Sequence, residues 1–297
     1  MAAPVVSVVI PTYNHAQYLG PALESLRAQT CADWEAVVVN NFSQDNTAEV
    51  VAAFNDPRIR LENFRNNGII AASRNHGWRL ARGALIAFLD SDDLWYPRKL
   101  ELCLARLAAG CDLVCHGERW FGNGQDRNVY YGPESRASYE ALLYDGNCIS
   151  TSAVVVKREQ LEAVGGFCED AEIVTAEDYE LWLRLARAGA CVGFVREILG
   201  EYRLHAGNQS GAVLRNMQAV ERVVQRHLAL ASPQTAGGRL RARCRRAIVY
   251  YSGARGLQAA GRHADASRLF LKALRLWPLT PKFYAAALLN AAGVRAQ

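Results

Sequence analysis

The sequence predicts an α/β protein whose central sheet is mostly parallel and carries helices on both faces. Two observations lead to this fold class. Short apolar, β-branched runs alternate with amphipathic segments from residue 5 to residue 89, and the short connections between them favour β–α–β units. Of the 297 residues, 51% are hydrophobic and 21% are charged, a composition that can bury a core and excludes wholesale disorder.

Strand and helix alternate in the N-terminal part of the chain. The β-branched run 5–10 predicts a buried strand that ends at Pro11, and apolar residues at helical spacing follow it. Gly83 is expected to close the third helix as a C-terminal cap. The expected strands cover 5–10, 34–39, 59–61 and 84–89, and the expected helices cover 18–29, 47–54 and 71–82.

The rest of the chain continues with mixed elements and then becomes helical. From residue 214 onward every pattern predicts helix, with a break at 231–238, where Pro and Gly residues gather. Before that, we expect helices at 99–109 and 176–188, strands at 113–115, 152–156 and 191–195, and a polar loop at 122–128.

Three polar clusters stand at the carboxyl ends of expected strands. They are the segments 11–14, 40–46 and 90–93. Open α/β sheets bind ligands outside the carboxyl ends of their strands. We therefore expect these clusters to converge on one rim and to form the binding site.

Hydropathy and cysteine usage indicate the compartment. Mean hydropathy is −0.07, and no stretch approaches the roughly 18 apolar residues that a spanning helix needs. The N-terminus has no pattern of a secretory signal, and the eight cysteines are scattered, which favours reduced thiols. We expect a cytoplasmic protein, peripheral at the inner face of the plasma membrane if its basic tail binds lipid.

Charge is distributed unevenly along the chain. From Arg215 to the C-terminus there are 15 Lys and Arg against 2 Asp and Glu, whereas residues 1–214 hold 19 against 27. Such a tail suits an anionic surface, and solvated arginine faces are the alternative. The densest basic run and the apolar residues beside it suit an anionic bilayer, and a buried helix pair with exposed arginines is equally open. These residues are Arg239, Arg241, Arg243, Arg245 and Arg246, and Trp277, Phe283, Tyr284, Leu288 and Leu289.

Two carboxylate clusters carry possible chemistry. Asp90, Asp92 and Asp93 follow a strand, and a divalent cation would relieve their repulsion; a helix N-cap is the alternative reading. Glu177 and Asp178 open a helix, where the helix dipole alone favours acidic residues, and one of them could act as a general base.

Two basic side chains and two missing motifs add to this picture. Arg74 could pair with phosphate, and His205 could bind a metal or a phosphate. The chain contains no GxGxxG and no GxxxxGK[ST] motif, which argues against a dinucleotide oxidoreductase and a P-loop enzyme.

Five motifs occurring in order resemble the family 2 glycosyltransferases of the GT-A fold, including their bacterial surface-polysaccharide branch. The resemblance covers roughly residues 4–210 and implies a DxD-type metal site with Mn²⁺ or Mg²⁺ as the cofactor. The motifs are SVVIPTYN at 7–14, NNFSQDNT at 40–47, SRNxG at 73–77, FLDSDD at 88–93 and EDYxLW at 177–182.

The resemblance also implies roles for individual residues. Asp92 and His205 would bind the metal, Asp178 would be the catalytic base, and Glu177 would be its neighbour in the catalytic pair. The residues that would bind the nucleotide-sugar are Pro11, Thr12, Tyr13, Asn14, Asn40, Asn41, Arg74, Asp90, Ser91 and Asp93.

One departure from the family affects the nucleotide base. The family usually has acidic residues where this chain has Asn40 and Asn41, and often Gly where it has Phe42. An Asn oxygen can still accept a hydrogen bond from a base, without the assistance of a charge. A UDP-sugar remains the expected donor.

The sequence thus predicts an inverting, metal-dependent glycosyltransferase that uses a nucleotide-sugar donor and a glycan acceptor, lipid-linked by family resemblance. Nucleic acid is not expected as a partner. The alternatives are a nucleotidyltransferase acting on sugar phosphates and a non-enzymatic basic helical adaptor. We expect a catalytic domain at 1–212, with nucleotide-sugar binding in about 1–95 and the acceptor side in about 96–212, and a basic helical extension at 213–297.

Overall fold

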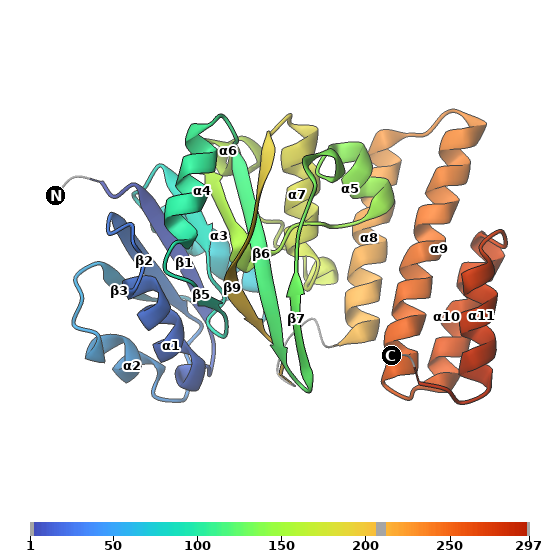
Figure 1. The fold of residues 1–297 in the computed structure, drawn as a ribbon, viewed down its shortest axis with the longest axis horizontal. Helices are drawn as coiled ribbons and strands as arrows, with labels where there is room; N and C mark the ends of the chain where they lie inside the picture. Colours follow the sequence, from blue (N-terminus) through green and yellow to red (C-terminus); the bar gives the residue numbers. More distant parts are fainter. Residues whose placement is uncertain (1–2, 206–211, 296–297) are drawn as a thin grey trace. The chain divides into compact units, whose positions relative to one another are not determined.

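The structure is a computed structural model that describes residues 3–205 and 212–295 (Figure 1). The chain divides into two compact units. The first unit comprises residues 1–139, 148–169 and 180–205, and the second comprises 140–147, 170–179 and the chain from 206 to the C-terminus.

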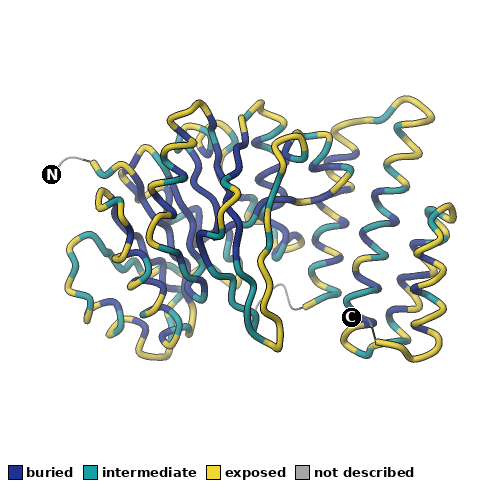
Figure 2. Tube along the Cα trace, in the orientation of Figure 1, coloured by how far each residue is buried: buried dark blue, intermediate teal, exposed yellow. Residues whose placement is uncertain are grey.

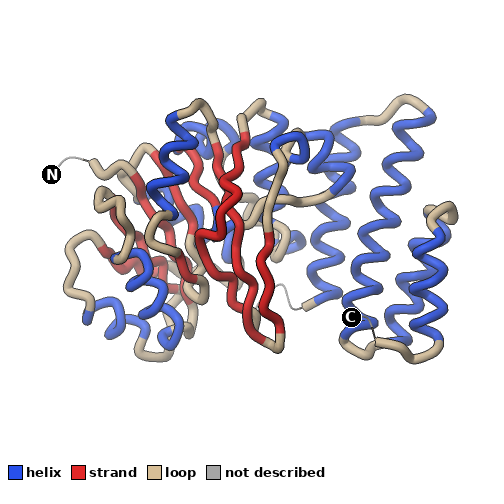
Figure 3. The backbone as a smooth tube through the Cα atoms, in the orientation of Figure 1, coloured by secondary structure: helices blue, strands red, loops and turns tan. Residues whose placement is uncertain are grey.

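The first unit is built on one nine-stranded sheet (Figure 3). Its first strand, β1, is buried along its whole length, as the β-branched run predicts. The strands are β1 (Val6–Thr12), β2 (Trp34–Asn40), β3 (Ile59–Asn63), β4 (Leu85–Phe88), β5 (Leu94–Trp95), β6 (Leu113–Gly122), β7 (Gln125–Val129), β8 (Val154–Lys157) and β9 (Val192–Arg203).

The strand order is β3-β2-β1-β4-β8-β6-β9-β5, with β7 paired to β6. One half, β3-β2-β1-β4, is parallel throughout. In the other half, β8 runs antiparallel to β4 and β6, and β6 pairs with β9 in parallel. The predicted α/β class is therefore confirmed, and the carboxyl ends of β1, β2 and β4 meet at one edge of the sheet.

Helices cover both faces of the parallel half. Val8 and Ile10 of β1 join the buried cluster that also contains Leu23 of the first helix. On the opposite face, Gly77 of the third helix lies so close that an added Cβ would be 2.4 Å from Val9 Cγ1. The helices with residues in the first unit are α1 (Ala16–Arg27), α2 (Thr47–Ala53), α3 (Ile70–Leu80), α4 (Lys99–Ala108), α5 (Tyr139–Asp145), α6 (Arg158–Val164) and α7 (Glu177–Arg187).

Two local predictions are wrong. The expected loop at 122–128 contains the last residue of β6, a two-residue turn and most of β7, and the turn residues Asn123 and Gly124 have positive φ. Its polar residues conceal the pairing because most of β7 is exposed. Gly83 is not a helix cap, because α3 already ends in an extended residue, Ala81. Gly83 instead permits a close approach, and its N–H donates to Ser7 Oγ at 2.8 Å.

Four helices among the described residues form the bulk of the second unit, and the break between the first two, at 232–235, lies within the predicted 231–238. Thr235 caps the helix after the break by accepting a hydrogen bond from the Gly238 N–H at 3.0 Å. None of the helices in residues 3–205 and 212–295 is long and apolar enough to cross a bilayer. The four helices are α8 (Val213–Ala231), α9 (Ala236–Ala259), α10 (His263–Leu276) and α11 (Pro281–Ala291).

The tail keeps only some of its predicted surface residues on the surface. Phe283 is fully buried and stacks on Tyr251 with ring centroids 4.5 Å apart, so its predicted exposure is wrong. Tyr284, Leu288 and Leu289 are exposed, as predicted. Figure 2 shows this alternation of buried and exposed positions along α10 and α11.

The basic run on α9 is likewise divided between surface and interior. Arg241 pairs with Glu140, and Arg246 pairs with Glu221 at 2.8 Å. Arg245 is 6% exposed. The run therefore presents less charge to solvent than its sequence suggests, because several of its guanidinium groups are ion-paired or buried within the second unit.

Candidate active site

The ends of β1 and β2 are tied together by the turn at Asn14. Asn14 has a left-handed φ of 53°, its N–H donates to Ser43 Oγ at 2.9 Å, and its Oδ1 accepts from the Gln44 N–H at 2.7 Å. Pro11 and Thr12 are buried in β1, whereas Tyr13 is 50% exposed. Two of the predicted polar clusters are therefore in direct contact.

Asn40 and Asn41 use their side-chain amides on the protein itself. Asn40 Oδ1 accepts from the Ser43 N–H at 3.0 Å, and Asn40 Nδ2 donates to Asn63 Oδ1 at 2.9 Å. Asn41 Oδ1 accepts from the Asn66 N–H at 3.0 Å. Both residues shape the loop after β2, and their contact with a nucleotide base stays a prediction.

Phe42 itself occupies a position whose backbone conformation favours glycine. Its φ is 55°, in the left-handed region that glycine adopts without steric cost. The ring is 50% exposed, and the Arg65 guanidinium lies 5.1 Å from its centroid. This chain therefore holds Phe42 in a backbone conformation that favours glycine and presents an aromatic face at the loop.

The third cluster, after β4, is joined to α3 by an ion pair. Arg74 Nη2 lies 2.8 Å from Asp90 Oδ1, and the Arg74 side chain is only 5% exposed while that of Asp90 is 26% exposed. Asn75 is also buried, but its amide binds the backbone of Phe167. Arg74 thus contacts the strand-end cluster, whereas its neighbour Asn75 joins α3 to the backbone at Phe167.

Asp92 faces His205, with Asp92 Oδ2 and His205 Nε2 2.8 Å apart. Their side chains are 12% and 16% exposed. The predicted metal pair is therefore brought together from two distant segments. Within the described part of the chain, no three His, Cys, Asp or Glu side chains cluster closely enough to hold a metal ion.

Asp93 is the most deeply buried acid of the cluster, at 1% exposure. Its Oδ1 accepts from the Arg203 N–H at 3.0 Å, while its Oδ2 is buried and has no hydrogen-bond partner among the described residues. Burial, followed by repulsion from Asp92, Asp90 and Glu118, raises the pKa of Asp93 well above its usual range.

These features fit a divalent cation. Crowded carboxylates disfavour one another's ionised forms, and the hard oxygen ligands that Mg²⁺ and Mn²⁺ prefer are present. The side chains of Asp92 and His205 would supply protein ligands, and phosphate oxygens would complete the shell.

Sequence reasoning missed the aromatic residues around this pair. Tyr18 stacks on His205 with centroids 5.0 Å apart, and His15 Nδ1 lies 3.0 Å from Ser91 Oγ. The Arg203 guanidinium lies 5.2 Å from the Tyr18 ring. His15 directly follows the strand-end segment 11–14, so its position in the sequence could have identified it as a candidate site residue.

Glu177 and Asp178 lie in the second unit, at the start of α7. Glu177 is 5% exposed, and its Oε2 accepts from the Thr175 N–H at 2.7 Å. Asp178 is half-buried, and its Oδ1 accepts from the Tyr179 N–H at 2.6 Å. Glu177 is therefore engaged in holding the backbone, and the catalytic role of Asp178 stays a prediction.

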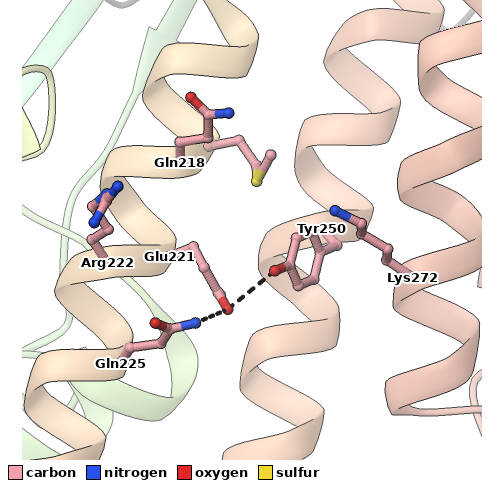
Figure 4. A pocket seen from close by; sticks show the side chains of 7 residues that line it. Gln218, Glu221, Arg222, Gln225, Tyr250 and Lys272 are labelled. Atoms are coloured by element: carbon pink, nitrogen blue, oxygen red, sulfur yellow. Dashed lines mark hydrogen bonds between the residues drawn. The ribbon is translucent and has the colours of Figure 1, made fainter. Parts of the chain in front are cut away.

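A separate groove lies in the second unit (Figure 4). It has a volume of about 410 Å³, and on its floor Glu221 Oε1 accepts from Gln225 and Tyr250. None of the predicted site residues lines it. The lining residues are Met217, Gln218, Glu221, Arg222, Gln225, Tyr250 and Lys272.

Comparison with known proteins gives a family match and bacterial relatives. The sequence model of the family described as glycosyl transferase family 2 matches residues 7–154. Bacillus subtilis TuaG, named for teichuronic acid biosynthesis, is 31% identical over 207 residues, covering 68% of this chain and 79% of that protein. Escherichia coli WfgD, named as a UDP-Glc:alpha-D-GlcNAc-diphosphoundecaprenol beta-1,3-glucosyltransferase, is 32% identical, covering 62% and 70%.

Solved structures share the fold at low identity. Residues 1–349 of Staphylococcus aureus TarS, in complex with UDP-GlcNAc, match with a TM-score of 0.60 at 16% identity over 97% of this chain and 92% of that chain. The mannosyltransferase PcManGT of Pyrobaculum calidifontis, in complex with GDP-Man and Mn²⁺, matches with a TM-score of 0.61 at 20% identity over 99% and 86%. The predicted GT-A-like fold is confirmed by these matches.

Proposed function

This chain belongs to glycosyl transferase family 2, and we propose that it transfers a sugar from a nucleoside diphosphate sugar to a glycan acceptor in polysaccharide biosynthesis. The observation that carries the proposal is the set of contacts after β4. Asp90 pairs with Arg74 and Asp92 pairs with His205 at the carboxyl edge of the parallel strands. That edge is where open α/β sheets bind their ligands.

The donor is a UDP-sugar. Support comes from relatives and neighbours: WfgD is named for UDP-Glc, and TarS was solved with UDP-GlcNAc. The loop formed by Asn14 and residues 40–46 holds the nucleoside, with the exposed Tyr13 beside it. Asp90, oriented by Arg74, contacts the ribose, and Ser91 and Asp93 line the nucleotide-sugar site.

Asp92 and His205 hold a divalent cation, Mn²⁺ or Mg²⁺. When bound, such a cation neutralises the charge that develops on a leaving nucleoside diphosphate. The support is the buried, mutually repelling acids and the complex of PcManGT with Mn²⁺. Tyr18 orients the His205 imidazole by stacking on it.

Asp178 acts as the general base. It removes the proton of the acceptor hydroxyl as that oxygen bonds to the anomeric carbon, while the bond from that carbon to the nucleoside diphosphate breaks and the nucleoside diphosphate leaves. A single displacement of this kind inverts the configuration. Glu177 orients the start of the helix through the Thr175 N–H.

The acceptor is a lipid-linked saccharide, and the enzyme works in the cytoplasm at the inner face of the plasma membrane. Support comes from the name of WfgD, whose acceptor is a diphosphoundecaprenol glycan. The exposed leucines of α11 and the basic residues of the tail suit an anionic bilayer. Functionally, we assign nucleotide-sugar binding to about 1–95 and the acceptor side to about 96–212. Within the helical extension 213–297, we assign membrane contact to the segment from about Arg239 on.

A screen of nucleotide-sugars with Mn²⁺ tests the proposed function. Purified protein is incubated with UDP-, GDP- and dTDP-sugars with and without Mn²⁺, and released nucleoside diphosphate is measured. We expect metal-dependent release from one UDP-sugar, faster with a glycan acceptor. Release of pyrophosphate from a sugar phosphate and nucleoside triphosphate would indicate a nucleotidyltransferase, and no turnover of any donor would favour the adaptor.

A further inference from the structure

The segment that leads into α7 belongs with the C-terminal helices. Residues 170–179 form part of the second unit, together with residues 140–147 and helices α8 to α11. The segment carries Glu177 and Asp178. The catalytic pair is therefore held partly by helices α8 to α11, which lie beyond the region that the family model matches, residues 7–154.

Thr175, just before the catalytic pair, has an unusual backbone conformation. Its φ is 88°, and a β-branched residue at positive φ persists only where its surroundings hold it. Two contacts do so here. The Thr175 N–H donates to Glu177 Oε2 at 2.7 Å, and Asn216 Nδ2 of α8 donates to the Thr175 carbonyl oxygen at 3.1 Å.

Arg245 of α9 holds the other side of the same helix start. It is 6% exposed, its Nε donates to the Leu143 carbonyl oxygen at 2.9 Å, and its Nη2 lies 3.3 Å from Tyr179 Oη. Tyr179 in turn donates its hydroxyl to the Leu142 carbonyl oxygen at 2.7 Å. Burying a guanidinium group costs free energy unless its N–H groups are hydrogen-bonded. The hydrogen bonds of Arg245 to Leu143 and Tyr179 therefore hold these segments in one arrangement.

Exposed ion pairs add to these contacts along the segment. Arg222 of α8 lies 2.7 Å from Glu172, and Arg226 pairs with Asp170. Because exposed pairs contribute little, the half-buried contact of Asn216 and the buried contacts of Arg245 carry the constraint. Asn216 contacts Thr175, three residues before Asp178, and Arg245 contacts Tyr179, one residue after it.

We propose that Asn216 and Arg245 are positioning residues that fix the direction in which the Asp178 carboxylate leaves the start of α7. The inference rests on the proposed function, because it takes Asp178 as the general base. Neither residue needs to touch substrate. A displacement of about 1 Å at a catalytic group can cost about 10²-fold in rate, so loosening this segment lowers turnover while donor binding persists.

The test compares Arg245→Met, Arg245→Lys and Asn216→Ala with a control, Arg98→Gln, which changes an exposed arginine that has no part in the proposed function. We expect kcat to fall about 10- to 100-fold in Arg245→Met and Asn216→Ala, with donor affinity, titrated directly, within about two-fold of wild type. Arg245→Lys restores a donor and should recover part of the loss. Arg98→Gln should retain wild-type kcat.

Combination with Asp178→Asn separates a positioning role from general damage. A residue that acts only through Asp178 should add little further loss once Asp178 is replaced. Losses that multiply, or a parallel loss of donor affinity, would overturn the inference. If Arg245→Met does not fold, as judged by circular dichroism, Asn216→Ala and Arg245→Lys decide the question in the same assays.

The failure of the inference and that of the proposed function are distinguishable. If Asp178→Asn keeps wild-type turnover, the assignment of the base is wrong and the inference falls with it. If Asp178→Asn is crippled while Arg245→Met and Asn216→Ala turn over like wild type, the proposed base stands and only the inference is wrong.

Discussion

His205 Nε2 lies 2.8 Å from Asp92 Oδ2, although 113 residues separate the two in the chain. The contact joins the segment after β9 to the segment after β4. It is reinforced by the Arg203 side chain, whose Nε donates to the Asp92 carbonyl oxygen at 3.1 Å. The pair is the part of the site on which metal dependence would rest.

Replacing Asp92 by Asn should remove metal-dependent donor binding. The amide keeps the shape of the carboxylate but loses the charge that attracts a divalent cation. We expect donor affinity in the presence of Mn²⁺ to weaken by at least about 10-fold, a loss seen even for residues that only support a metal ligand. Calorimetric titration of nucleotide with and without Mn²⁺ measures this. Glu159→Gln, at an exposed acid, is the control, and an unchanged metal-dependent affinity in Asp92→Asn would refute the metal role.

Asp178→Asn should impair turnover more than Glu177→Gln. The Asp178 change removes the proposed base, so kcat should fall about 10²–10⁴-fold with donor affinity nearly intact. Gln at 177 keeps an oxygen that can accept the Thr175 N–H, so its loss should be smaller. Steady-state kinetics with separate donor titration measures both. If Glu177→Gln is the more impaired variant at unchanged donor affinity, the two roles must be exchanged.

The exposed leucines at the C-terminal end should promote binding to anionic vesicles. Leu279 and Leu288 are 70% and 72% exposed, and basic residues flank them. We expect wild-type protein to co-sediment with anionic vesicles more than with neutral ones, less so near 1 M salt. The double change Leu279→Ser and Leu288→Ser should reduce binding. Leu230→Ser, at a leucine of α8 that is 54% exposed, is the control. Equal binding to both vesicle types, or none, would contradict the prediction.

Glu118 should make stability fall as pH rises toward neutrality. Burial raises the pKa of Glu118 from 4.5 to about 7, and hydrogen bonds, the first from Tyr131, oppose that rise. The folded protein therefore keeps a proton that the unfolded chain releases near pH 4.5, so the free energy of unfolding decreases between about pH 4.5 and 7. The full shift corresponds to about 3 kcal/mol.

Glu118→Gln lacks this titration and keeps an acceptor for the Tyr131 hydroxyl. Its stability relative to wild type should rise across the same pH window, as measured by urea unfolding at several pH values. Comparison with wild type cancels the opposite contribution of His116, whose pKa burial lowers to about 3. A stability difference that does not change with pH would show that Glu118 is ionised throughout.

Much of the first unit could be predicted because its signals are local. A β-branched run such as residues 5–10 and the helical spacing after it specify strand and helix by themselves. Chain direction then places the strand ends at one edge. The helices and strands that were missed, α5, α6, β5 and β7, are short or exposed, and their residues lack a long apolar period that sequence reasoning could detect.

The sequence by itself determined the fold class, the convergence of the three strand-end clusters and the family to which the chain belongs. Only the tertiary structure decided which of several similar residues are internal. Arg243 and Arg245 lie two positions apart in one basic run, yet Arg243 is exposed and Arg245 is buried against the Leu143 carbonyl oxygen. Nothing in the run distinguishes them, because burial depends on a partner segment about a hundred residues away. The same reason separates the exposed Tyr284 from the buried Phe283, since a side chain's environment is set by what packs against its face of the helix.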